Sequence, residues 1–108
     1  MTERIESLEK LLADGQDNAL LRYSLGNAYL DTDAKLAAQH FERALDFDSN
    51  YSAAWKLLGK AHTQSNNEAA AIIAYQNGIA IAKQNGDLQA MKEMQVFLKR
   101  LTKNAAKP

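Results

Sequence analysis

The fold is decided by the stretch WKLLGKAHTQSNNEAAAIIAYQNG, which runs from Trp55 to Gly78. In its first half, a Trp, a Leu-Gly pair and a His follow one another at steps of three or four residues. In its second half, an Ala, a Tyr and a Gly follow the same spacing. Such steps place the residues of each half on one face of an α-helix. The polar run Ser65-Asn66-Asn67 between the halves indicates a turn, so the stretch predicts two antiparallel helices.

An earlier stretch, RYSLGNAYLDTDAKLAAQHFERA over residues 22–44, carries the same pattern. Its first half is offset from the later copy by 33 residues and its second half by 34 residues. Self-similarity at such a period is typical of a helical-repeat architecture. The residues expected to pack the two copies are Leu25, Gly26, Tyr29, Ala37, Phe41, Ala44, Trp55, Leu58, Gly59, His62, Ala71, Tyr75 and Gly78.

Two glycines stand at equivalent positions inside the expected helices, Gly26 and Gly59. A glycine inside a helix costs about 1 kcal/mol relative to alanine. A cost repeated at equivalent positions indicates a packing reason. We therefore expect the paired helices to approach each other most closely at these glycines.

The pattern W-x2-L-G-x2-Y followed by A-x3-F, at a period of 34 residues, resembles the tetratricopeptide repeat. The first copy departs from that pattern at Arg22, where the repeat has Trp, and at Ser49, where it has Pro. The resemblance implies an all-α solenoid of antiparallel helix pairs. It also implies a non-enzymatic protein–protein interaction module, an adaptor or co-chaperone-like protein, without a cofactor.

Five polar turn clusters divide the chain into about six helices. The clusters end at Asn18, Asp33, Asn50, Asn67 and Asp87, and each of these side chains is suited to capping the next helix. The expected helices are 3–13, 18–30, 34–47, 52–64, 67–84 and 87–103. We expect a single domain over 1–108, divided into an N-terminal half repeat (1–17), two repeats (18–51 and 52–85), a C-terminal capping helix (86–103) and a tail (104–108).

Composition restricts the chemistry and the location. The 108 residues include no cysteine, which excludes disulfides and thiolate metal sites. The acidic start Met1-Thr2-Glu3 does not resemble a signal peptide, and the longest strongly apolar stretch, Ala69 to Ala74, is too short to span a membrane. The sequence therefore predicts a cytoplasmic protein with no membrane association.

Neither of the two histidines is predicted to be catalytic. His62 holds the place of the repeat's Tyr, so we expect it to pack between helices. His40 is expected on the surface, and the residues one turn away from it offer no carboxylate and no second metal ligand. The sequence predicts neither a catalytic residue nor a metal site.

A binding groove is expected where the first helices of the repeats line the concave face, as the resemblance implies. The residues one turn apart that would face it are Tyr23 and Asn27 in the first repeat, and Lys56 and Lys60 in the second. This set suits an acidic peptide or a C-terminal carboxylate. Relatives that clamp a carboxylate use Lys and Asn, and only Asn27 matches here, with Tyr23 in place of a Lys. The alternative is that both lysines only solvate a helix face.

The C-terminal segment leaves further alternatives open. An apolar stripe formed by Met91, Met94, Leu98 and Leu101, with Phe97 on its flank, predicts internal capping, a homodimer seam or a Met-rich binding surface. A weaker alternative is contact with nucleic acid through a basic run formed by Lys92, Lys99, Arg100, Lys103 and Lys107. A third possible function is that of a structural subunit in a larger assembly.

Charge is distributed unevenly along the chain. The net charge of zero is the sum of −5 over residues 1–54 and +5 over residues 55–108. Opposed halves on a roughly linear fold would favour salt-sensitive head-to-tail association. We expect a monomer or a weak homodimer.

Overall fold

A computed structural model describes residues 2–105, which form six helices and no strand. Their bounds are α1 Thr2–Ala13, α2 Ala19–Tyr29, α3 Ala34–Phe47, α4 Ser52–Gln64, α5 Glu68–Asn85 and α6 Leu88–Ala105. Each expected helix is present, with its ends within two residues of the predicted position. The all-α fold class is confirmed.

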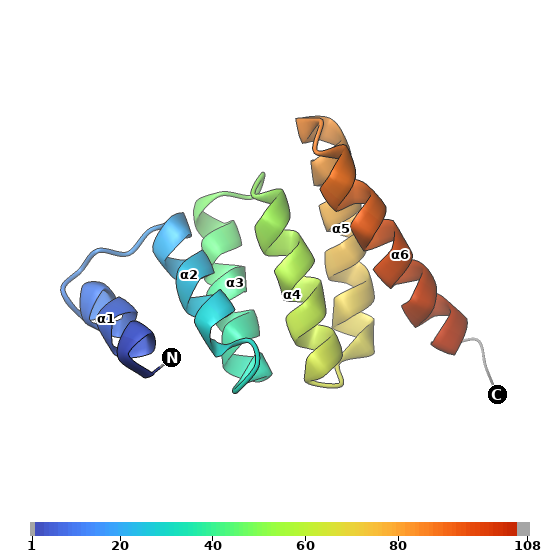
Figure 1. Cartoon of the computed structure of the whole chain (residues 1–108). Coiled ribbons are helices and arrows are strands. Elements are labelled where there is room, and N and C mark those ends of the chain that lie inside the picture. The colour runs from blue at the N-terminus through green and yellow to red at the C-terminus, as the bar shows by residue number, and fades with distance from the viewer. Residues whose placement is uncertain (1, 106–108) are drawn as a thin grey trace.

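The helices form a single row in which each packs on its neighbours in sequence (Figure 1). Close packing joins α2 with α3, α3 with α4, α4 with α5, and α5 with α6. In Figure 1, α2, α4 and α6 lie toward the viewer, while α3 and α5 lie behind them. The molecule is elongated, with principal extents of 47 × 31 × 19 Å. The chain therefore has two long faces, and α2, α4 and α6 lie together on one of them.

Short polar side chains cap four of the helices, as the turn clusters predicted. The side chains of Asn18, Asp33, Asn67 and Asp87 each accept a hydrogen bond from a backbone N–H one turn into the helix that follows. Gly86 ends α5 in the left-handed region, with φ of 75°, which favours a residue without Cβ.

The expected cap of α4 is wrong. The cluster Asp48-Ser49-Asn50 predicted a polar cap, but the N-cap residue is Tyr51, which makes no side-chain capping bond. The Tyr51 ring instead stacks on Tyr23 of α2, with ring centroids 4.9 Å apart. Asp48 accepts from the backbone N–H of Asn50 at 3.0 Å, so this polar cluster stabilises the turn itself.

The helical glycines lie where rings from the partner helix leave no room for a side chain. A Cβ added to Gly26 would lie 2.6 Å from Cε1 of Phe41, and one added to Gly59 would overlap the ring of Tyr75. At Gly78 no ring is involved: an added Cβ would lie 2.5 Å from the sulfur of Met94 and 2.7 Å from Cβ of Trp55. The predicted close approach at Gly26 and Gly59 is confirmed.

The core follows the repeat pattern. Leu25, Phe41 and Met94 are its largest fully buried side chains. Of the thirteen residues expected to pack the repeats, ten are buried, and the three that are half-buried are Tyr29, Trp55 and His62. Trp55 lies between the two halves of the core and packs against both. The repeats thus share one continuous apolar interior.

The last helix covers the open end of this interior. Met94 and Leu101 of α6 are buried against α5, with Met91 and Leu98 half-buried beside them. Val96 lies off this stripe and is 48% exposed. Of the three interpretations of the stripe, the structure supports internal capping.

Candidate functional site: the face formed by α2, α4 and α6

The two groove residues predicted on α2 have different surroundings. Tyr23 is half-buried; its ring stacks on Tyr51 and lies 5.9 Å from that of Phe41. Asn27, one turn farther along α2, is exposed. Tyr23 thus has a packing role, while the Asn27 amide is available to solvent.

The two predicted lysines on α4 also differ. Lys56 Nζ lies 3.3 Å from Oε1 of Glu93 on α6, with 27% of its side chain exposed. Lys60, one turn along, is exposed. The ion pair joins α4 to α6 across 37 residues of sequence, a little more than one repeat. Lys60 is the more accessible cation of the two lysines.

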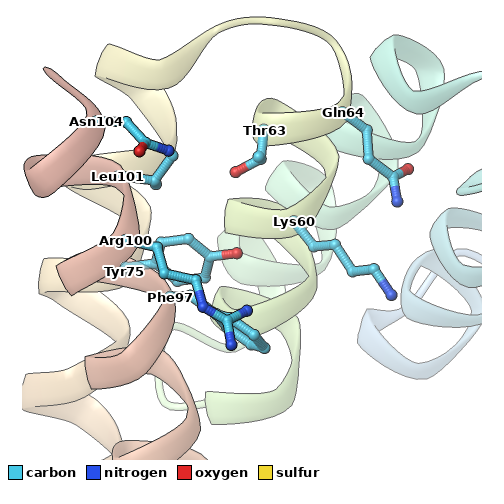
Figure 2. A pocket seen from close by; sticks show the side chains of 8 residues that line it. All are labelled: Lys60, Thr63, Gln64, Tyr75, Phe97, Arg100, Leu101 and Asn104. Carbon is cyan, nitrogen blue, oxygen red and sulfur yellow. The ribbon is translucent and has the colours of Figure 1, made fainter. Parts of the chain in front are cut away.

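Beside Lys60, a cleft of about 410 Å³ opens between α4 and α6 (Figure 2). Its floor is aromatic: Tyr75 of α5 is only 3% exposed, and its ring centroid lies 5.7 Å from that of Phe97. Burial raises the pKa of the Tyr75 hydroxyl, so this group stays neutral well above pH 7. The residues that line the cleft are Lys60, Thr63, Gln64, Tyr75, Phe97, Arg100, Leu101 and Asn104.

The rim of this cleft is cationic and amide-rich. Lys60 from α4 and Arg100 from α6 supply positive charge, and Gln64 and Asn104 supply amides. Among the described residues that line the cleft there is no Asp or Glu. An apolar floor beneath a cationic rim suits an anionic ligand that also carries an apolar group.

Sequence reasoning assigned Phe97 to the flank of the α6 stripe and Arg100 to a basic run, and so missed the cleft. The signal was present in their spacing: Phe97, Arg100, Leu101 and Asn104 follow at i, i+3, i+4 and i+7, which places them on one face of a helix. What the sequence lacked was the position of α6 relative to α4.

A polar cluster joins α1, α2 and α3 at the other end of the molecule. Arg22 makes two hydrogen bonds to the Asp17 carboxylate, at 2.7 and 2.9 Å, and its Nη1 lies 3.2 Å from Nδ1 of His40. Nε2 of His40 lies 4.0 Å from Oε1 of Glu9 on α1. The ring of Tyr29 stacks on that of His40 at 5.7 Å.

The expected surface position of His40 is therefore wrong. His40, predicted on the surface, is 7% exposed, because α1 and Tyr29 cover it. His62, predicted between helices, is half-buried and lines a polar hollow with Lys35 and Glu42 of α3. The carboxylate near His40 comes from a different helix, so inspection of its own helix could not find it.

Within residues 2–105, no group of three or more His, Asp or Glu side chains is arranged to hold a metal ion. No helix in this range has the length and apolar character needed to cross a bilayer.

Comparison with known proteins places this arrangement in a family. No family model matches the chain. The chain is 54% identical over 98 residues to TPR repeat-containing protein PA0015 of Pseudomonas aeruginosa. The matched residues cover 90% of this chain and 93% of that protein. The chain belongs to the tetratricopeptide-repeat family. The resemblance seen in the two 34-residue copies is thereby confirmed.

Solved structures agree with this assignment to the tetratricopeptide repeats. Protein BPP2914 of Bordetella parapertussis is similar with a TM-score of 0.82 at 46% identity, over 94% of this chain and 90% of that one. A tetratricopeptide repeat domain protein of Salinibacter ruber has a TM-score of 0.70 at 26% identity, over 77% and 85% of the two chains. The tetratricopeptide fold described here thus has solved counterparts over most of its length.

The two tetratricopeptide repeats differ from each other at the polar cluster. Arg22 stands where the second repeat has Trp55, and His40 where it has Ala74. An apolar pair in the second repeat is thus replaced by a hydrogen-bonded polar pair in the first. This exchange occurs where α1, a single helix rather than a full repeat, meets the repeats.

Proposed function

We propose that this tetratricopeptide-repeat protein is a non-catalytic interaction module that binds an acidic segment of a partner protein along α2, α4 and α6. The observation that carries the proposal is the cationic rim formed by Lys60 and Arg100, in a lining without Asp or Glu. Lys56 and the exposed amide of Asn27 lie on the same series of helices. Lysine and arginine attract carboxylates, and the amide can donate to a peptide backbone.

Membership of the family supports a protein partner rather than a small substrate, since such repeats generally mediate protein interactions. Within the proposal, the module acts as a cytoplasmic adaptor, as a monomer or a weak homodimer. The opposed charges of its halves favour salt-sensitive association of the homodimer.

The test is a comparison of charge reversals. The partner is captured from the source cell by the purified chain, and its binding segment is located by peptide mapping. The double variant Lys56→Glu with Lys60→Glu is expected to weaken binding of that segment at least tenfold. The control, Lys35→Glu with Lys83→Glu, changes net charge equally at exposed positions on α3 and α5. Equal affinities of both double variants and the unaltered chain would refute the proposal.

A nucleic-acid partner is the second candidate, because Lys92, Lys99, Arg100 and Lys103 are all exposed on α6. Lys107, also in this basic run, lies outside the described residues. Binding to phosphates weakens steeply with salt, since it releases counterions. A titration of RNA or DNA at rising salt separates the two functions: strong binding at low salt that vanishes at moderate salt would favour this candidate.

A further inference from the structure

The cleft between α4 and α6 differs from its counterpart one repeat earlier. In the first repeat, the ring beside Phe41 is Tyr23, and Tyr51 stacks on it. In the second repeat, the ring beside Tyr75 is Phe97 of α6, and both line an open cleft. The ring beside the buried aromatic residue is thus stacked on a second ring in the first repeat and lines an open cleft in the second.

The position of α6 explains the opening. Lys56 and Glu93 hold α4 and α6 together one helical turn before the cleft begins. Beyond this pair, Tyr75 of α5 lies at the base of the space between the two helices, as Figure 2 shows. The cleft is therefore bounded by packed helices on three sides, and its walls are held by the buried Leu101 and by the ion pair.

We propose that this cleft receives one large apolar side chain, best an aromatic one, from the acidic segment that the module binds. A cleft of about 410 Å³ has room for such a side chain, and its lining offers the half-buried ring of Phe97 beside the buried Tyr75 and Leu101. Lys60 and Arg100 then meet acidic residues on either side of the anchor. This inference rests on the proposed function and adds a requirement to it: acidic residues alone do not give tight binding, and the segment also needs an apolar anchor.

The occupant is a protein segment that carries both acidic and aromatic side chains, because the lining of the cleft combines cationic and aromatic groups. A bare polyanion would leave the aromatic floor unused, and an uncharged apolar group would leave Lys60 and Arg100 unpaired. Gln64 and Asn104 at the rim can bond to the backbone of an extended segment. A segment with acidic residues around one aromatic residue satisfies all of these groups together.

The test uses labelled model peptides and the full chain. One peptide consists of Asp and Glu around a central Phe; a second has Ala in place of Phe; a third has the central Phe among lysines. Fluorescence anisotropy is expected to show the acidic Phe peptide binding about tenfold more tightly than the acidic Ala peptide, because anchors in such clefts dominate binding. The lysine peptide is expected to bind most weakly.

A cleft-filling variant locates the effect. Thr63 is exposed on α4 and lines the cleft, so Thr63→Phe places a ring in the space of the anchor. The preference for Phe over Ala is expected to disappear in this variant. Thr102→Phe is the matched control: Thr102 is also exposed, and each threonine hydroxyl bonds to a carbonyl one turn earlier.

The outcomes separate this inference from the function beneath it. Equal binding of the two acidic peptides, weakened by the charge reversal at Lys56 and Lys60, would overturn the anchor and leave the module intact. A Phe preference that persists in Thr63→Phe would place the anchor elsewhere and also overturn the inference. Absence of binding by every acidic peptide would overturn both proposals.

Discussion

Nη1 of Arg22 lies 3.2 Å from Nδ1 of His40, and the second repeat has Trp55 and Ala74 at the equivalent positions. A guanidinium group only donates hydrogen bonds, so Nδ1 of His40 accepts here and its proton resides on Nε2. Nε2 in turn lies 4.0 Å from the Glu9 carboxylate. The neutral imidazole thus links α1 to the first repeat.

Stability is expected to fall as pH drops below about 6.5, the ordinary pKa of histidine. Burial, together with the Arg22 charge, lowers the pKa of His40, and this outweighs the opposite effect of Glu9 and Asp17. The folded chain therefore takes up the proton less readily than the unfolded chain. The stabilisation is fully present above the unfolded pKa and declines as pH falls toward the folded one.

Thermal unfolding followed by circular dichroism between about pH 7.5 and about pH 5 measures this decline. His40→Gln is expected to flatten it, and His62→Gln, which removes a histidine outside the cluster, is the control. Arg22 also lowers the pKa of Asp17 below 3.8, so the contribution of that carboxylate is lost only at lower pH. An unchanged slope in His40→Gln would contradict the assignment.

Gly59→Ala is expected to destabilise the fold, although alanine favours helix. The gain in helix propensity is about 1 kcal/mol. The new methyl group, however, overlaps the buried ring of Tyr75. Such overpacking costs about 1–3 kcal/mol, which outweighs the gain in helix propensity. Urea unfolding should show a net loss. In Gly59→Ala with Tyr75→Leu, the loss should be smaller than the sum of the single losses; simple additivity would contradict the contact.

Local patterns predicted most of the fold, since helix ends and the Gly-aromatic contacts depend on residues close in sequence or on an exact repeat. Three features escaped because they depend on distant elements. Tyr51, and not the polar Asn50, precedes α4, and its ring stacks on Tyr23 of α2. His40 is buried because α1 covers it. The cleft exists because α6 brings Arg100 opposite Lys60, and no pattern in either helix specifies that placement.

Met94→Ala is expected to cost about 2–5 kcal/mol, the range for a large side chain removed from a core. Met94 is fully buried, and its sulfur lies against Gly78 of α5. Met91→Ala, at a half-buried position on the same helix, should cost less. The Met94→Ala substitution should accelerate amide hydrogen exchange more in α6 than in α2. Equal costs at both positions would contradict the view that α6 is held mainly through Met94.

Glu93→Gln is expected to strengthen binding of acidic peptides up to about fivefold while changing stability by less than about 1 kcal/mol. The Glu93 carboxylate is 42% exposed and partly neutralises Lys56 at 3.3 Å, so its removal leaves a third cation near the cleft. Anisotropy titration with an acidic peptide measures the gain. Glu42→Gln, the same change at an exposed position on α3, is the control. Weaker binding by Glu93→Gln would contradict this expectation. It would mean that the ion pair contributes to binding by holding α4 and α6 in place, and that this contribution exceeds the gain from the freed charge of Lys56.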